Sequence, residues 1–155
     1  MHYQNYFTLN NPVILNIKPG TNFSTTDNGI QYVDAKDTIF LNNYTTGGIR
    51  NKTNLTLNIL CIYHIAFTRS STSASGNYIY TKIKRHDNTT TTYTDYRYLG
   101  TTLFFPNTNT AYVTGCSAVS IHPNGGYIAI MTSVSSGTAQ ISTSGRVELY
   151  PMGLG

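Results

Sequence analysis

The chain has 155 residues, of which only 10% are charged, and its formal net charge is +4 at pH 7. A chain of this length fits one domain, and such a domain buries about 70% of the surface that its unfolded form exposes. Its Lys and Arg residues are not clustered as in nucleic-acid-binding proteins, and no apolar run reaches the roughly 18 residues of a membrane-spanning helix. We therefore expect no nucleic-acid partner and no membrane span. The opening residues, MHYQNYFTLN, lack the basic and apolar regions of a signal peptide, so we expect none.

The composition favours strands over helices. Threonine, asparagine, serine, glycine and tyrosine dominate, and Glu148 is the only glutamate. Helices are thereby deprived of several of their best formers, whereas β-branched and aromatic residues suit strands. Glycine and asparagine recur at the spacing of turns between short strands. The predicted fold class is therefore all-β, a sandwich or jelly roll of two antiparallel sheets.

The chain divides into a short arm and one domain. Residues 1–11 are polar and unpatterned and are predicted to form an N-terminal arm, and residues 12–155 a single jelly-roll domain. In chain order, strands are predicted at residues 12–18, 29–34, 38–42, 55–68, 77–86, 111–121, 127–134, 138–142 and 146–150. Residues 93–105 are predicted to hold two short strands that break near Gly100, residues 43–54 a loop, and residues 122–126 a tight turn.

The rest of the chain is organised around the strand predicted at residues 55–68. Its first face is apolar or aromatic throughout and consists of Leu55, Leu57, Ile59, Cys61, Tyr63, Ile65 and Phe67. Its second face is polar at both ends and apolar in the middle, and consists of Thr56, Asn58, Leu60, Ile62, His64, Ala66 and Thr68. A strand covered on one side only would keep its second face polar. Either both faces are covered within one monomer, or Leu60, Ile62 and Ala66, with His64 beside them, meet a neighbouring subunit.

The same alternation predicts the core of the sandwich. Its expected members are Leu57, Ile59, Cys61, Ile65, Phe67, Ile79, Ile83, Val119, Ile121, Ile128 and Ile130. Both cysteines, Cys61 and Cys116, lie within strand patterns. Because no export signal is visible, we expect buried free thiols rather than a disulfide.

The sequence shows no signature of catalysis or metal binding. A glycosidase needs two carboxylates facing each other across a cleft, but Asp34 and Asp37 flank a turn, where capping accounts for them. The four histidines do not pair at a metal-ligand spacing, and there is neither a Cys-x-x-Cys motif nor a G-x-S-x-G nucleophile elbow. We expect no metal, no cofactor and no hydrolase activity on polysaccharides or esters.

One strand is predicted to present tyrosines and bases together. Tyr78, Tyr80, Lys82, Lys84 and His86 share its outer face. Aromatic rings interleaved with cations can stack on sugars or bases, although a solvated strand face has the same pattern. Loops at the end of a sandwich also collect binding residues, here residues 69–76 and 87–92. The candidate ligand-binding residues are Tyr78, Tyr80, Lys82, Lys84, Tyr93 and Tyr96.

The strand and turn pattern over about residues 55–150 resembles a known family. Residues 114–121 form a strand of small polar residues, and the turn His122–Gly126 leads into Tyr127-Ile128-Ala129-Ile130. Residues 137–141 and 146–149 complete the pattern, and the aromatic strand of residues 61–67 precedes it. This arrangement is similar to the trimeric jelly-roll heads of the tumour necrosis factor and first complement component superfamily, which include heads of viral fibres. The resemblance implies a homotrimer that displays loops for binding.

Three functions are consistent with these features. The first is a non-enzymatic homotrimeric head of a viral or phage surface or fibre protein, which attaches to a host receptor, either a cell-surface glycan or a protein. The second is a structural jelly-roll capsid protein, such as a penton or minor capsid protein. Both place the chain at the virion surface or in the capsid. The third, an enzyme such as a polysaccharide depolymerase, would need a carboxylate pair that the sequence does not reveal. In the trimer, Leu60, Ile62, His64 and Ala66 are expected near the axis, and protonation of three His64 copies is expected to loosen it.

Overall fold

The structure is a computed structural model, and it describes residues 12–19, 23–33, 41–43, 48–69, 78–87, 94–103, 108–139 and 141–154. The predicted arm at residues 1–11 lies outside this part of the chain. The described residues form strands, bridges and turns, and contain no helix.

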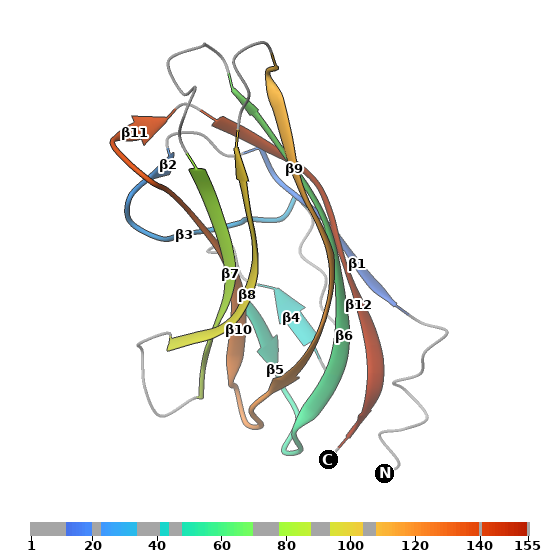
Figure 1. The fold of residues 1–155 in the computed structure, drawn as a ribbon. Helices are drawn as coiled ribbons and strands as arrows, with labels where there is room; N and C mark the ends of the chain where they lie inside the picture. The colour runs from blue at the N-terminus through green and yellow to red at the C-terminus, as the bar shows by residue number, and fades with distance from the viewer. Residues whose placement is uncertain are drawn as a thin grey trace.

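Two antiparallel sheets pack face to face (Figure 1). The first contains four strands in the order β1 (Val13–Asn16), β12 (Ile141–Leu154), β6 (Leu57–Arg69) and β9 (Thr110–Ile121). The second has the order β4 (Leu41–Asn43), β5 (Gly48–Asn51), β10 (Tyr127–Val134), β7 (Tyr78–His86) and β8 (Thr94–Leu103), with β3 (Asn28–Gly29) also paired to β10. A separate short pair joins β2 (Phe23–Ser24) to β11 (Thr138–Ala139). The predicted two-sheet antiparallel sandwich is confirmed.

The core lies between the two sheets and is built from alternate residues of each strand. In β6, side chains from Leu57 to Phe67 are buried at every second position, because one face of the strand lies against the other sheet. All eleven predicted core residues are buried in one apolar cluster. The period-two pattern therefore identified the buried face of the central strand correctly, apart from Leu55, which precedes β6 and is 38% exposed.

Several predicted strand boundaries are wrong. Residues 94–103 form one strand. Gly100 does not interrupt it, because it pairs with Thr81, and the pairing of β8 with β7 continues through two register shifts. The strands predicted at 138–142 and 146–150 are largely one long strand, β12, because Gly145 stays within the ladder opposite Ile65. The loop predicted at 43–54 contains β5, whose short sequence GIRN has no alternating pattern. Part of the strand predicted at 38–42 lies outside the described residues.

The cysteines are both free, and only one of them is buried. Cys61 lies in the core, where burial raises the pKa of its thiol to about 12. Cys116 is exposed, which contradicts the prediction of two buried thiols. In β9 the side chains of Val113 and Val119 face the core, and Cys116 has the opposite parity. Strand alternation therefore directs it away from the core.

We expect Ile65→Ala to lower the free energy of unfolding by about 2–5 kcal/mol, because Ile65 is fully buried at the centre of β6 and its loss leaves a cavity. Urea denaturation followed by circular dichroism measures the change. Val33→Ala is the control, since Val33 is largely exposed and should change the stability by less than about 0.5 kcal/mol. A loss as small as that of the control would show that Ile65 does not face the core.

Candidate functional site

The predicted outer face of β7 is confirmed for its two tyrosines. Tyr78 and Tyr80 are exposed, and their rings stack with centroids 6.5 Å apart and planes 20° apart. On the opposite side of the same strand, Ile79 and Ile83 point into the core. The strand therefore buries one face and presents an aromatic face on the side away from the four-stranded sheet.

The two lysines of this face are held by carboxylates from other segments. Asp27 lies 2.7 Å from the Nζ of Lys84 and 3.2 Å from that of Lys82, and Asp95 lies 3.7 Å and 3.4 Å from the same two atoms. Burial alone would raise the pKa of Asp27, but hydrogen bonds from Lys84 and Lys82 outweigh it and lower that pKa. Burial alone would lower the pKa of Lys82, but its hydrogen bond and attraction to Asp27 raise it. The positive charges of the two lysines are thus balanced by the negative charges of the two carboxylates.

We expect Asp27→Asn to destabilise the fold at pH 7 by up to about 1 kcal/mol, because it removes the carboxylate shared by Lys82 and Lys84. The pKa of Asp27 is lowered from 3.8 in the folded state, so its contribution is complete above pH 3.8 and is lost as the pH falls through the lowered value. Thermal unfolding at pH 7 and at successively more acidic pH should therefore show the gap between wild type and variant closing in acid. A gap that stays constant would contradict the pairing.

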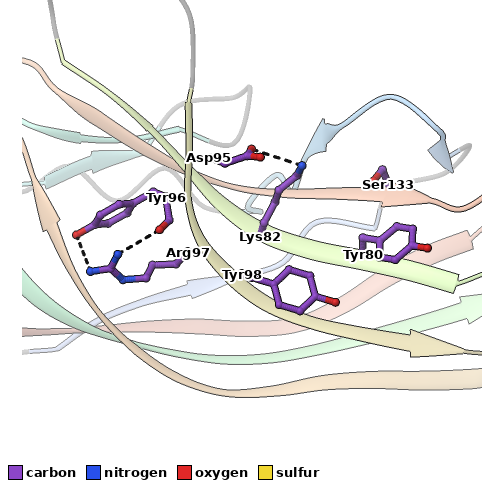
Figure 2. Close-up of a pocket in the computed structure, with 7 residues that line it drawn as sticks. All are labelled: Tyr80, Lys82, Asp95, Tyr96, Arg97, Tyr98 and Ser133. Atoms are coloured by element: carbon purple, nitrogen blue, oxygen red, sulfur yellow. Dashed lines mark hydrogen bonds and ion pairs between the residues drawn. The ribbon is translucent and has the colours of Figure 1, made fainter.

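A groove of about 410 Å³ opens beside this face. Figure 2 shows its lining residues, which come from β7, β8 and β10: Tyr80, Lys82, Asp95, Tyr96, Arg97, Tyr98 and Ser133. Its volume is within the range of small-ligand sites, and its lining combines aromatic rings with a few polar groups, as ligand sites do. Lys82 is paired with Tyr98 on the neighbouring strand, which places β7 and β8 residues together.

Three of the predicted ligand-binding residues meet in this groove. Tyr80, Lys82 and Tyr96 line it, whereas Tyr78 and Lys84 lie along the same β7 face, and Tyr93 lies outside the described residues. The loops predicted to bind, at residues 69–76 and 87–92, are also almost entirely outside them. The sequence pattern did not identify four lining residues: Asp95, Arg97, Tyr98 and Ser133. The sequence could have indicated Tyr98, since it is an aromatic residue in a polar stretch. The face of the sheet to which its side chain points, however, depends on the register shifts of β8.

Tyr96 is anchored between the two sheets. Its hydroxyl accepts a hydrogen bond from the backbone N–H of Ser120 on β9, at 3.1 Å. The guanidinium carbons of Arg85 and Arg97 lie 3.7 Å and 4.1 Å from the centroid of its ring, a cation–π arrangement. Burial alone would raise the pKa of Tyr96, but the hydrogen bonds to Ser120 and the two cations lower it. Tyr96 and the two arginines therefore form an ordered cluster that joins β8 to β9.

The second face of β6 lies on the outside of the four-stranded sheet. Leu60, Ile62 and Ala66 are half-buried there, and no described strand covers them. Cross-strand pairing extends the apolar area: Ala118 lies beside Leu60, Cys116 beside Ile62, and Tyr112 beside Ala66. On the other side of β6, Tyr150 pairs with Leu60. We call this surface the outer β6 face, comprising Leu60, Ile62, Ala66, Tyr112, Cys116, Ala118 and Tyr150.

A cluster of charged and polar side chains lies across the outer β6 face. The Nε2 of His64 lies 3.3 Å from an Oε atom of Glu148, and the same carboxylate accepts hydrogen bonds from Arg146 and from the Tyr150 hydroxyl. The hydrogen bond from Tyr150 is the largest effect on Glu148 and, with the bond from Arg146, lowers its pKa. The sequence analysis expected three protonated His64 side chains to loosen the trimer, and it did not consider Glu148. The carboxylate of Glu148 gives each His64 a counter-ion within its own chain.

The described residues contain no group of three or more His, Cys, Asp or Glu side chains suited to hold a metal ion. In the same part of the chain, we find no helix with the length and apolar character needed to cross a membrane.

Comparison with known proteins identifies the fold. A scan against protein-family models and a search of curated protein sequences give no match. The crystal structure of murine APRIL at pH 8.5 aligns with a TM-score of 0.53 and 11% identity, over 90% of this chain and 99% of that chain. The structure of murine APRIL at pH 5.0 gives a TM-score of 0.51 and 12% identity, over 89% and 99%. The arrangement of strands in this chain is therefore the tumour necrosis factor-like β-sandwich that the resemblance implied.

Proposed function

We propose that this chain is a homotrimeric binding head of a viral or phage surface or fibre protein, which attaches to a host receptor or glycan without catalysing a reaction. The observation that carries this proposal is the outer β6 face, an apolar surface left half-exposed on a single chain. Its residues lie in a regular ladder on a rigid sheet, so they cannot turn inward.

Assembly is the simplest way to cover this face. Soluble monomers rarely expose a contiguous apolar patch of large extent, and such patches mark interaction sites. Tyr112 is 65% exposed in the single chain, although it extends the apolar surface beside Ala66. A cyclic arrangement of identical chains covers one patch per subunit and then closes on itself. Three is the number of subunits that the family resemblance implies.

The charged group on this face is compatible with burial between subunits. Glu148 is paired with Arg146 and His64 and accepts a hydrogen bond from Tyr150, so its carboxylate is already satisfied. Buried charges need such partners, because an unpaired charge costs several kcal/mol to bring out of water. These paired side chains can therefore be buried between neighbouring subunits without leaving an isolated charge.

The groove lies on the other sheet, away from the outer β6 face. Assembly through one face therefore leaves the other free to contact a ligand. Three copies of such a groove would act together on a surface, because binding of one site raises the effective concentration of the others. Two of the described carboxylates, Asp27 and Asp95, are engaged by lysines, which supports binding rather than hydrolysis.

Binding of labelled protein to immobilised glycans and to cells tests the proposal. We expect saturable binding without release of sugar or ester products. A variant that is monomeric but retains the groove should bind at least about tenfold more weakly, because avidity is lost. Product formation abolished by Asp95→Asn would contradict the non-enzymatic role. Assembly into pentamers or shells without binding would favour the structural capsid protein instead.

A further inference from the structure

The pairing of β7 with its two neighbours decides which side chains share the groove. Tyr80 pairs with Ser133 on β10, and Lys82 pairs with Tyr98 on β8. Directly paired residues of a sheet point to the same side, so these four side chains share its outer face. Asp95 joins them, because one of its oxygens lies 3.4 Å from the Nζ of Lys82 (Figure 2). A ligand on the outer face can therefore touch all five.

The guanidinium of Arg97 is on the other side of the sheet. Arg97 pairs with Ile83, whose side chain points into the core. Its guanidinium lies over the ring of Tyr96 and donates to the hydroxyl of the same residue. A ligand on the outer face therefore does not meet the charge of Arg97.

The charges on the outer face compensate one another. An anion bound at Lys82 or Lys84 would have to compete with Asp27 and Asp95, and a cation bound at Asp95 would have to compete with the two lysines. Asp27 makes the closest contact, 2.7 Å from Lys84, whereas Asp95 is 3.4 Å or more from either lysine and its side chain is 70% exposed. Asp95 can therefore accept hydrogen bonds from a ligand while Asp27 holds the lysines. This surface complements a neutral ligand that carries hydroxyl groups.

The tyrosines supply a flat apolar surface beside these polar groups. Tyr98 is 65% exposed and Tyr80 is 36% exposed, and the ring of Tyr78 stacks on that of Tyr80. Tyrosine combines a broad contact area with little conformational freedom to lose on binding. A pyranose ring has a face of C–H groups that suits such a surface, and hydroxyls at its rim that suit the polar groups.

We propose that the groove binds a neutral saccharide, with the C–H face of a pyranose ring against Tyr98 and Tyr80 and its hydroxyls at Asp95, Lys82 and Ser133. This inference rests on the proposed function, because it names the class of ligand that the binding head would hold. Galactose, glucose, mannose and N-acetylglucosamine share this chemistry, and the experiment distinguishes them.

Titration calorimetry with five soluble saccharides tests the inference: lactose, cellobiose, mannobiose, chitobiose and 3′-sialyllactose. We expect at least one of the four neutral disaccharides to bind, and its affinity to change less than about twofold between about 50 and about 500 mM salt, because no ion pair forms. 3′-Sialyllactose adds a carboxylate to lactose and should bind no more tightly than lactose. The inference would be overturned if none of the four neutral sugars bound at up to about 10 mM, or if 3′-sialyllactose bound about tenfold more tightly than lactose.

Variants locate the site. Tyr98→Ala should lower the affinity for the bound disaccharide about fivefold or more, and Tyr98→Phe should recover most of that loss because it restores the ring. Asp95→Asn should also lower it about fivefold or more, because a hydrogen bond to a charged acceptor is lost. Val33→Ala is the matched control, since it truncates a similarly exposed side chain that does not line the groove and should change nothing. Unchanged affinity in the Tyr98→Ala variant would exclude the groove.

The two proposals can fail separately. A protein that assembles as a trimer and binds cells, but binds none of the neutral disaccharides, would overturn this inference and leave the proposed function standing. A chain that binds a neutral disaccharide through Tyr98 but sediments as a monomer would uphold the inference and contradict the trimeric head.

Discussion

Replacing Leu60 and Ile62 together with aspartate should convert the assembled protein into folded monomers. Both side chains lie at the centre of the outer β6 face, next to Ala118 and Cys116 on β9. Two carboxylates per subunit would be taken out of water at the interface, and each unpaired buried charge costs several kcal/mol. Glu148 lies opposite Ile62, so the carboxylate introduced by Ile62→Asp would also meet a like charge. Sedimentation velocity of wild type and variant at neutral pH measures the change.

The double variant should keep its own fold, because both positions face away from the core. A matched control places two aspartates on the opposite side of the sandwich, as Tyr78→Asp with Tyr80→Asp. Those residues lie on the outer face of the six-stranded sheet and are expected to leave the mass of the particle unchanged. If the double variant at Leu60 and Ile62 still sediments with wild type, the outer β6 face is not the interface.

Replacing Gly145 with alanine should destabilise the fold strongly. Gly145 has φ +107°, a conformation that residues with a Cβ rarely adopt. A Cβ atom built there would overlap the carbonyl oxygen of His64, so the centre of β6 would have to shift. The carbonyl of Gly145 also accepts a hydrogen bond from the backbone N–H of Ile17, at 2.9 Å, which ties β12 to the N-terminal strand region. The backbone strain alone costs about 1–3 kcal/mol, and the clash adds to it.

A second glycine separates strain from clash. Gly137 has φ +63°, but no atom lies within 4 Å of the Cβ position. Gly137→Ala should therefore cost only about 1 kcal/mol, because only the backbone preference is lost. Urea denaturation of the two variants compares them directly. Equal stability of Gly145→Ala and Gly137→Ala would contradict the close approach of β12 to β6.

Much of the sandwich could be predicted because burial on one side enforces a period of two. From Leu57 to Phe67 every second residue is apolar, and the same parity holds for Ile79 and Ile83 on β7. The exposed position of Cys116 was equally available from parity, since it is out of phase with Val113 and Val119. The usual preference of cysteine for the interior led to the wrong prediction there.

Other features depend on contacts that no local pattern carries. Asp27 reaches Lys82 and Lys84 only because the chain folds back onto the second sheet through β3, which follows Asp27 directly and pairs with β10. The irregular pairing of β8 with β7 sets the side to which Tyr98 points, and a register shift cannot be predicted from alternation.

The buried polar residue Asn51 is a third example. Its side-chain amide donates to the carbonyls of Leu55 and Ile121, and its backbone carbonyl accepts from the tight turn at Gly125. These bonds order the end of β5, yet a sequence reader sees only an asparagine in a stretch rich in polar residues. The structure at this end of β5 therefore depends on hydrogen-bond partners far apart in sequence, which hydrophobic periodicity does not reveal.

The mass of the native particle tests the central claim most directly. Light scattering coupled to size-exclusion chromatography of the unmodified chain at neutral pH should give three times the chain mass of 17.1 kDa. Repeating the measurement over a range of protein concentrations should leave this value unchanged wherever the trimer is tight. A mass of one chain at concentrations where the protein is folded would contradict the trimeric head, and a mass of five chains would favour the capsid protein.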